Sequence, residues 1–335
     1  MRKNLLKSSG FPMPVDPNHD LGRIAWAASD SWYIKCVFKS NGKQLGFTWH
    51  QMINTQPDGT QFVSLESVFM NATDDVWIHK NAAIPVSDTA NADADRLNVF
   101  TPYGGVTGDM QGMNLTYDFE GQRIDVHLTP TGEIEHQGAT GLMDYGSLQS
   151  YEYGLVNMAA TGTVTIDGVT YPLEEGSAWF DRQYGTLNQK QEPPLFVPGV
   201  ASWLWLGIDN LTNQGGAVSF GDIYNPGSRM SFATFLHTDG TEVNVDADIK
   251  YDDIWTSSKT GFSYPRTISI DVPTEDFNVK LTSMAHTEDI EFVMPGENKG
   301  LSGCQCLFKM SGAYHGKKLN HACIVETIGD LCGEA

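Results

Sequence analysis

The chain has 335 residues, which is long enough for two ordinary domains or one large all-β domain. Hydrophobic residues make up 40% and charged residues 19% of it, a composition typical of a folded protein rather than a disordered one. Lys and Arg number 21 against 41 Asp and Glu, and the formal net charge of -20 argues against nucleic acid and anionic membranes as partners, because both are bound through basic side chains.

Short strands separated by turn signals fill the first half of the chain. Residues 1–25 are rich in proline and show no periodicity, so we expect an irregular leader there. From residue 31, apolar and polar side chains alternate, and Asn41-Gly42 predicts a tight hairpin turn before a return strand over 45–50. Residues 85–103 are expected to hold a short helix or a loop. The other predicted elements are strands over 61–70, 113–119, 123–128 and 151–166, an alternative aromatic loop over 144–154, and turns at Glu120-Gly121 and Asp167-Gly168.

A polar segment that ends in Pro193-Pro194 separates two halves of similar length. Prolines and polar residues break regular structure, so residues 189–200 are predicted to link an N-terminal domain, 26–188, to a C-terminal domain, 201–335. The strands predicted in the second half begin at Ser202 and continue over 230–236, 243–245, 267–272, 277–281, 290–293, 304–314 and 319–327. Many short strands with regular turns predict an all-β fold of sandwiches or barrels, and a late hairpin in each half hints at a duplicated barrel.

Several chemistries lack their sequence motifs. The chain contains no G-x-G-x-x-G after a strand, no G-x-x-x-x-G-K-[ST], no H-E-x-x-H and no G-x-S-x-G. Cys304 and Cys306, taken with His315, His321 and Cys323, match no common zinc spacing, and we expect the two cysteines to be small buried hydrophobic residues. We therefore predict no metal ion and no cofactor.

The cellular location is inferred from the cysteines and from the start of the chain. Five scattered cysteines are an odd number and do not resemble a disulfide framework, which favours a reducing compartment. The basic start, Met1 to Lys7, is not followed by the apolar run of a secretory signal, and no stretch is apolar enough to span a bilayer. We expect a cytoplasmic protein without membrane insertion, and a homodimer is one option for its assembly.

The stretch over residues 176–185 places an acid within an aromatic run between two glycines. If this stretch is extended, its side chains alternate between two faces. The two faces are then Trp179, Asp181 and Gln183 on one side and Phe180, Arg182 and Tyr184 on the other.

A second aromatic pair, Trp203 and Trp205, follows with the same spacing. In a small barrel most aromatic side chains belong to the core. Barrels also hold ligands in their mouths, so these two tryptophans could line a cavity instead.

Three motifs together resemble the AttH/CrtC-like family, which includes carotenoid 1,2-hydratase and fungal decalin-forming Diels-Alderases. They are Gly-x-x-Trp-x-Asp at 176–181, Trp-x-Trp at 203–205 and Trp-x-Ser-x-x-Thr-Gly-x-x-Tyr-Pro at 255–265. The resemblance covers residues 150–330 well and 30–150 loosely. It implies two lipocalin-like antiparallel β-barrels packed together, a substrate pocket near their junction, and action on hydrophobic, unsaturated substrates without a redox cofactor.

The resemblance implies a proton donor at Asp181, since an aspartate is proposed to protonate an alkene in the hydratase. Here Asp181 is followed by Arg182, Gln183 and Tyr184, so the surroundings of the acid need not match. Donation at neutral pH requires burial to raise the pKa of the acid, and Trp179 and Trp205 could supply apolar walls and stabilise an allylic cation. The alternative is a structural aspartate that pairs with an arginine or caps a turn, which would lower its pKa.

Other candidates follow from their chemistry. His50 titrates near neutrality and is a second candidate proton carrier, although a lone histidine on a strand is usually only packed or exposed. Gln183 could orient a water or a substrate carbonyl, and Tyr153, Tyr184 and Tyr264 could donate hydrogen bonds to a carbonyl oxygen. The candidate catalytic residues are Asp181, Tyr184 and His50, and the candidate substrate-binding residues are Trp49, Tyr153, Trp179, Gln183, Trp203, Trp205, Trp255 and Tyr264.

Two functions of different classes remain open. The first is a cofactor-independent isomerase, hydratase or cyclase that acts on a terpenoid, fatty-acyl or polyketide type of molecule. The second is a lipocalin-like carrier that binds such a molecule and leaves it unchanged. Proton transfer predicts that Asp181→Asn abolishes turnover, whereas templating of a pericyclic reaction predicts a larger loss from Trp205→Ala.

Overall fold

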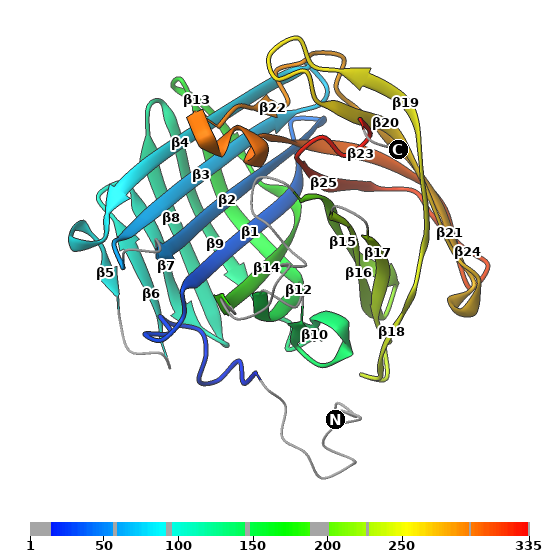
Figure 1. Ribbon diagram of the computed structural model, residues 1–335, viewed down its shortest axis with the longest axis horizontal. Helices are drawn as coiled ribbons and strands as arrows, with labels where there is room; N and C mark the ends of the chain where they lie inside the picture. Colours follow the sequence, from blue (N-terminus) through cyan, green and yellow to red (C-terminus); the bar gives the residue numbers. More distant parts are fainter. Residues whose placement is uncertain are drawn as a thin grey trace.

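The computed structural model describes residues 15–55, 59–91, 96–144, 148–187, 201–225, 228–294 and 296–333. Within these ranges the chain forms 25 β-strands and four short 3-10 helices, with no α-helix. The strands make two curved antiparallel sheets, and the predicted all-β class with two barrel-like sheets is confirmed (Figure 1). None of the helices described is long and apolar enough to cross a membrane. The predicted linker, 189–200, lies outside the described residues.

The N-terminal sheet has 14 strands, and its main path runs β4-β3-β2-β1-β14-β12-β9-β8-β7-β6-β5. Three further strands, β10, β11 and β13, pair with β12 off this path. The bounds are β1 (Ser29–Ser40), β2 (Lys43–Thr55), β3 (Gln61–Asn71), β4 (Val76–Pro85), β5 (Ala90–Asn91), β6 (Leu97–Thr101), β7 (Gly104–Asp109), β8 (Gly112–Phe119), β9 (Gln122–Thr129), β10 (Ile134–His136), β11 (Leu142–Asp144), β12 (Leu148–Ile166), β13 (Val169–Pro172) and β14 (Glu174–Leu187).

The C-terminal sheet has 11 strands, and its main path runs β18-β17-β16-β15-β25-β23-β21-β20-β19. Strands β22 and β24 pair with β23 off this path. The bounds are β15 (Ser202–Thr212), β16 (Gly215–Asn225), β17 (Ser228–Leu236), β18 (Glu242–Asp246), β19 (Asp248–Thr256), β20 (Ser263–Val272), β21 (Phe277–Ser283), β22 (Glu291–Phe292), β23 (Gly303–Tyr314), β24 (Lys317–Leu319) and β25 (Ala322–Ile328). The 3-10 helices are η1 (Val86–Asp88), η2 (Gln137–Ala139), η3 (Pro273–Glu275) and η4 (Gly296–Leu301).

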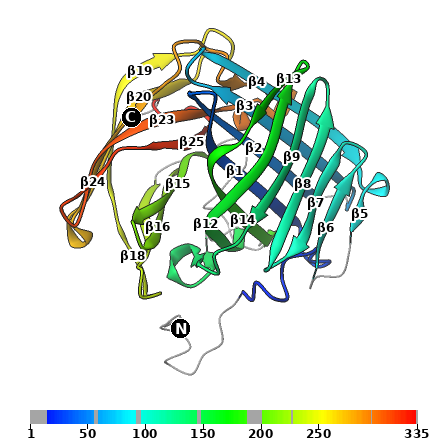
Figure 2. The same cartoon turned by 180° about the vertical axis from the view of Figure 1, so that it is seen from behind.

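The two sheets share one strand order. Figure 1 and Figure 2 show the sheets from opposite sides. In each sheet, three strands step outward on one side of the first strand in sequence, and the last strand in sequence pairs with the first on its other side. Strands β1 and β14 therefore occupy the places that β15 and β25 occupy in the second sheet. This common order supports the duplicated barrel that the late hairpins suggested.

The tight turns follow the predicted chemistry. Asn41 and Gly42 both have positive φ, at 51° and 76°, and so do Asp167 and Gly168, at 47° and 84°. Two consecutive positive φ values define the type I′ turn that matches the twist of a hairpin. These two hairpins are confirmed by the pairing of β1 with β2 and of β12 with β13.

Some elements differ from the prediction. In the described part of 85–103, where a short helix or a loop was expected, the structure has the short 3-10 helix η1 and, in addition, strands β5 and β6. Strand β12 begins at Leu148, where an aromatic loop was an alternative, and β4 and β16 were not predicted. Strands β4 and β16 carry Asn-Ala-Ala and Gly-Gly-Ala segments, whose weak strand propensity is overcome by pairing with β3 and with β15 and β17.

Arg182 anchors the segment that precedes β1 to the wall of the N-terminal sheet. Its side chain is fully buried and forms an ion pair of 2.6 Å with Asp30. Its other N–H groups donate to the backbone carbonyls of Asp20, Gly22, Ser31 and Gln183. Asp181 is not the ion-pair partner of Arg182, because adjacent residues on a strand face opposite sides.

Arg182→Ala is expected to lower the free energy of unfolding by about 3 kcal/mol, because it leaves the Asp30 carboxylate and several carbonyls buried and unpaired. Urea unfolding of the purified chain measures this loss. Arg123→Ala is the control, since Arg123 is 60% exposed. An equal effect from the two substitutions would contradict the anchoring role.

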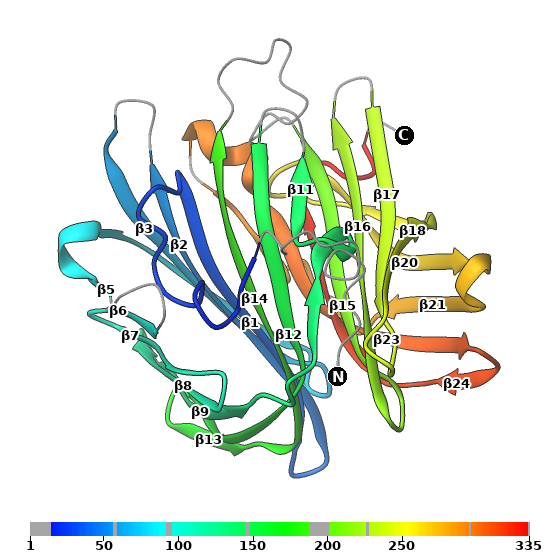
Figure 3. The same cartoon turned by 90° about the horizontal axis from the view of Figure 1, so that it is seen from below.

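At the junction between the two sheets, which Figure 3 shows from below, β1 contacts β25 and β14 contacts β15. Lys35 Nζ on β1 donates to the carbonyl of Gly207 on β15 at 2.7 Å, and Thr48 on β2 bonds Gln305 on β23. The segment formed by β10 and η2 crosses to the second sheet, where the His136 amide donates to Glu242 at 2.7 Å. The β1–β14 and β15–β25 pairs therefore face each other at this junction.

Candidate active site at the sheet junction

The indole of Trp179 lies between the two sheets because glycines leave room for it on both sides. A Cβ added at Gly154 on β12 would lie 2.7 Å from Trp179 Nε1, and one added at Gly207 on β15 would lie 2.9 Å from the ring. Trp179 Nε1 donates to Asp181 Oδ1 at 2.5 Å. The motif spacing of tryptophan and aspartate thus places both side chains on the junction face, as the alternation predicted.

Two aromatic–acid pairs form the walls of the site, one from each sheet. Tyr33 on β1 lies opposite Asp181 on β14, and Trp205 on β15 lies opposite Glu326 on β25. These pairs hold equivalent places in the shared strand order. The Tyr33 and Trp205 rings meet edge to face, with centroids 5.6 Å apart. The duplicated fold therefore brings an acid from each half to one junction.

Burial sets the protonation of these acids. Asp181 is 8% exposed, and burial raises its pKa to about 7, although the Trp179 hydrogen bond and the Lys35 charge oppose the shift. Burial also raises the pKa of Glu326 to about 7, despite hydrogen bonds from Trp203 at 3.3 Å and Gln305 at 2.8 Å. Both acids can therefore exchange protons near neutral pH.

Glu152 on β12 adds a third acid on the same face. It is 9% exposed, and burial together with the charge of Asp181 raises the pKa of its carboxyl group. Its Oε2 accepts a hydrogen bond of 3.0 Å from Gln183. The predicted residue Gln183 therefore orients an acid of the site.

Lys35 and His50 complete the polar surface. Lys35 Nζ lies 4.9 Å above the Trp179 ring and 3.6 Å from the Asp209 carboxylate. His50 on β2 stands edge to face with Tyr33, and its Nε2 lies 2.7 Å from Ser31 Oγ. Burial lowers the pKa of His50, which favours a neutral imidazole at pH 7.

The structure brings six of the predicted residues together at the junction. The six are His50, Trp179, Asp181, Gln183, Trp203 and Trp205. Gln183, Trp203, Trp205 and His50 are only partly buried. Glu326 is likewise only partly buried, whereas Asp181 and Glu152 are at most 9% exposed.

The other predicted residues lie in the two cores. Trp49, Tyr153 and Tyr184 face the interior of the N-terminal sheet, and the Tyr184 hydroxyl donates to Asp20 at 2.9 Å. Trp255 and Tyr264 belong to the core of the C-terminal sheet. Strand alternation explains the first group, because Trp49 and Tyr184 are the sequence neighbours of His50 and Gln183.

The motif over 255–265 surrounds a buried carboxylate, Glu291. The hydroxyl groups of Ser257, Thr260 and Tyr264 all donate to the two oxygens of this side chain. Glu291 is 4% exposed and begins the short strand β22. The polar residues of this motif therefore hold a loop to the C-terminal barrel.

Glu291→Ala is expected to lower the free energy of unfolding by about 2 kcal/mol, because three buried hydroxyl groups lose their common acceptor. Thermal unfolding followed by near-UV circular dichroism measures the loss. Glu288→Ala is a control on the same loop, where the side chain accepts from Ser258 in an exposed contact. A Glu291→Ala variant as stable as the parent chain would contradict the role of Glu291 in holding this loop.

Sequence reasoning missed four residues of the junction: Tyr33, Lys35, Glu152 and Glu326. Tyr33 and Lys35 alternate with the apolar residues of β1, and that signal was available. Glu326 could have been found only from the duplication, because its partner Trp205 is more than 100 residues away along the chain. Tyr33 stays protonated, since burial and the charges of Glu326 and Asp181 raise the pKa of its hydroxyl.

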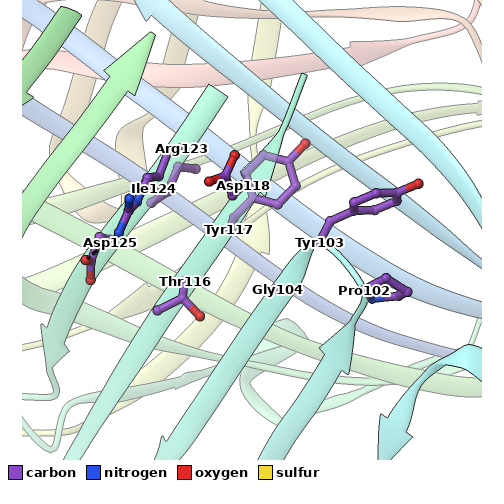
Figure 4. Close-up of a pocket in the computed structure, with 9 residues that line it drawn as sticks. All are labelled: Pro102, Tyr103, Gly104, Thr116, Tyr117, Asp118, Arg123, Ile124 and Asp125. Atoms are coloured by element: carbon purple, nitrogen blue, oxygen red, sulfur yellow. Dashed lines mark ion pairs between the residues drawn. The ribbon is translucent and has the colours of Figure 1, made fainter. Parts of the chain in front are cut away.

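Two cavities lie away from this junction. One of about 360 Å³ lies over β7, β8 and β9 and is lined by Tyr103, Thr116 and Asp118 among others (Figure 4). Its charged residues Arg123 and Asp125 are 60% and 59% exposed, so solvent screens them. Another of about 200 Å³ in the C-terminal half is lined by His237 and Tyr314 among others. Buried acids with near-neutral pKa values make the junction the stronger candidate for acid–base chemistry.

Two curated proteins are similar in sequence to parts of this chain. A dehydratase, asqC, from Emericella nidulans is 23% identical over 185 residues, which are 52% of this chain and 48% of the relative. Kievitone hydratase from Fusarium solani subsp. phaseoli is 24% identical over 217 residues, or 62% of this chain and 57% of the relative. The chain thus spans about half the length of the curated relatives it matches.

Solved structures share the fold, and a family model matches most of the sequence. Kievitone hydratase from Nectria haematococca superposes with a TM-score of 0.75 at 16% identity, over 95% of this chain and 93% of the other. A candidate AttH from Nitrosomonas europaea gives 0.74 at 17% identity, over 94% and 97%. The model of the AttH-like family matches residues 13–295. The resemblance seen in the motifs is therefore confirmed, and the chain belongs to the AttH-like family.

Proposed function

We propose that this chain is a hydratase or dehydratase in which Asp181 and Glu326 act as an acid–base pair. The observation that carries the proposal is the arrangement of two acids, the buried Asp181 from one sheet and the partly buried Glu326 from the other, beside Tyr33 and Trp205. Two groups with pKa values near neutrality can be present as one acid and one carboxylate at the same time. The names of the two curated relatives, a dehydratase and a hydratase, support the same reaction class.

Hydration of a double bond needs a protonated carboxyl group and a carboxylate at the same time. The protonated carboxyl of Asp181 donates its proton to one carbon of a double bond, and water bonds to the other carbon. The carboxylate of Glu326 takes the proton that the water loses. The reverse sequence removes water, and neither direction changes an oxidation state of the protein or requires a redox cofactor.

The aromatic walls favour a hydrophobic, unsaturated substrate. Trp179 and Trp205 pack with Val156, Ala217 and Leu236 in a small apolar cluster at the junction. Their ring faces would exclude water from the double bond and stabilise positive charge on carbon. Isomerisation and cyclisation remain alternatives that use the same acid and the same walls.

Three further predictions from the sequence concern domains, location and assembly. We propose domains of 26–188 and 201–335, a cytoplasmic location and a homodimer as one option for assembly. All five cysteines are unpaired, which suits a reducing compartment. The expected absence of a metal ion and of a cofactor also stays a prediction.

Mass spectrometry in oxygen-18-labelled water tests the proposal. Kievitone is the first compound to assay, because a relative carries its name, and an extract of the source cells is the second. A product that gains one labelled water, or loses one water, supports the enzyme. Unchanged ligand recovered in stoichiometric amount from both samples would instead support the carrier.

A further inference from the structure

We infer that the Tyr33 hydroxyl and the Trp205 indole N–H bind an oxygen atom of the substrate, so that the reacting double bond is conjugated to a carbonyl group. The inference rests on the proposed function and names its substrate class: an α,β-unsaturated ketone or acyl compound, or the matching β-hydroxy carbonyl compound in the dehydration direction. A carrier or a hydratase of isolated alkenes would not need this oxygen site.

Both polar groups are buried without a hydrogen-bond partner among the residues that the structure describes. The Tyr33 side chain is 6% exposed, and its hydroxyl has no partner within that part of the chain. Trp205 Nε1 is also a buried atom without a hydrogen-bond partner in that part of the chain. An unsatisfied buried donor is costly, and native proteins seldom keep one without a function or a bound molecule.

The two rings that carry these donors meet from opposite sheets. Tyr33 is on β1 and Trp205 is on β15, and their rings are 84° apart at a centroid distance of 5.6 Å. The ring of His50, at 5.5 Å and 88°, supports the other side of Tyr33. The ring contact thus brings a hydroxyl from one sheet and an indole N–H from the other to the same junction.

The neighbouring acids are already engaged with other donors. Asp181 Oδ1 accepts from Trp179, and the two oxygens of Glu326 accept from Trp203 and Gln305. Trp205 Nε1 can only donate, so the missing partner must present an acceptor. A carbonyl oxygen meets this requirement with its two lone pairs.

A substrate carbonyl bound by Tyr33 and Trp205 would take part in the addition of water. As water oxygen bonds to the β-carbon, the π electrons move to the carbonyl oxygen, and Glu326 takes the proton that water loses. The enolate electrons then return to the α-carbon, which takes the proton of Asp181. A proton transfer from Glu326 to Asp181 restores the site, and one water has been added without oxidation or reduction. The two donors stabilise the enolate oxygen as an oxyanion hole does.

The surrounding charges are compatible with an enolate only while the acids are largely neutral. Protonated carboxyl groups at Asp181 and Glu152 do not repel the developing negative charge, and Lys35 adds a positive charge beside Trp205, 5.9 Å from its ring. Neutral acids next to hydrogen-bond donors are an established way to hold an enolate.

Equilibrium dialysis with trans-chalcone and trans-stilbene tests the inference. Both probes have two phenyl rings and a carbon–carbon double bond, and only chalcone has a conjugated carbonyl. We expect the parent chain to bind chalcone at least about tenfold more tightly than stilbene. Tyr33→Phe, which keeps the ring and removes the hydroxyl, should abolish most of this preference.

Tyr117→Phe is the matched control, because the Tyr117 hydroxyl is also buried and unpartnered in the described structure but belongs to the N-terminal core. Trp205→Phe is a second test variant should Tyr33→Phe fail to fold. Equal affinity for the two probes, no binding of either, or the same loss in the Tyr33 and Tyr117 variants would overturn the inference. Dialysis involves no turnover, so a failure of water addition would count against the proposed function and leave this result unaffected.

Discussion

Asp181→Asn is expected to lower turnover by about 10²- to 10⁴-fold and to leave substrate binding nearly unchanged. An amide cannot donate the proton that the double bond needs, yet its oxygen can still accept the hydrogen bond that Trp179 gives to Asp181. The fold and the apolar walls should therefore persist. The measurement is the single-turnover rate on the substrate found by mass spectrometry, with binding measured separately.

The pH dependence separates a proton donor from a merely polar residue. Asp181 must be protonated and Glu326 ionised, and burial raises the pKa of each to about 7, so the rate should fall on both sides of neutrality. Asp181→Asn should remove the alkaline fall from the residual rate. Asp125→Asn, which changes an exposed acid on β9, is the control and should keep the parent profile. Full activity of Asp181→Asn would exclude the donor role.

The site was partly predictable because a strand exposes alternate residues to one face. Once β14 is extended, Trp179, Asp181 and Gln183 must share a surface, whatever the rest of the fold does. The same rule could not say which surface faces the second sheet. Tyr184 and Trp49 therefore entered the prediction and lie in a core.

Sequence motifs also mix residues that hold the fold with residues that face the junction. Within 255–265, Tyr264 bonds Glu291 and Trp255 packs in the core, so this motif preserves a loop rather than a binding surface. Gly207, which follows the Trp-x-Trp motif, does contribute to the junction between the sheets. Gly207 makes space for the Trp179 indole, and a side chain there would push the two sheets apart.

Glu326 shows what the sequence alone could not provide. Its place opposite Trp205 depends on the closure of the second sheet by β25. Residues far apart in the chain meet there only because both sheets share a strand order, and low sequence similarity between the halves hides that order. The proposed acid–base pair thus depends on the tertiary fold, with one member from each half.

The same burial that raises the pKa values of these acids should make the fold less stable at high pH. Asp181 has a raised pKa in the folded chain, so the folded state binds more protons than the unfolded state between pH 4 and 7. Its contribution to stability is fully present below the unfolded value of 3.8 and is lost as the pH rises through about 7. Glu326 and Glu152 act in the same direction, because burial raises their pKa values too.

Asp181→Asn is therefore expected to make the chain more stable than its parent at pH 8, by up to about 4 kcal/mol, and to change stability by less than about 1 kcal/mol at pH 4. The amide carries no charge that burial could penalise, and it keeps the Trp179 hydrogen bond. Urea unfolding at pH 4, 6 and 8 measures the difference, with Asp125→Asn as the exposed control. A variant less stable than the parent at pH 8, or a difference that does not depend on pH, would mean that Asp181 is held as a carboxylate for the fold. A gain in stability at pH 8 together with a loss of turnover would show that the junction retains a buried acid at the expense of stability because the reaction requires it.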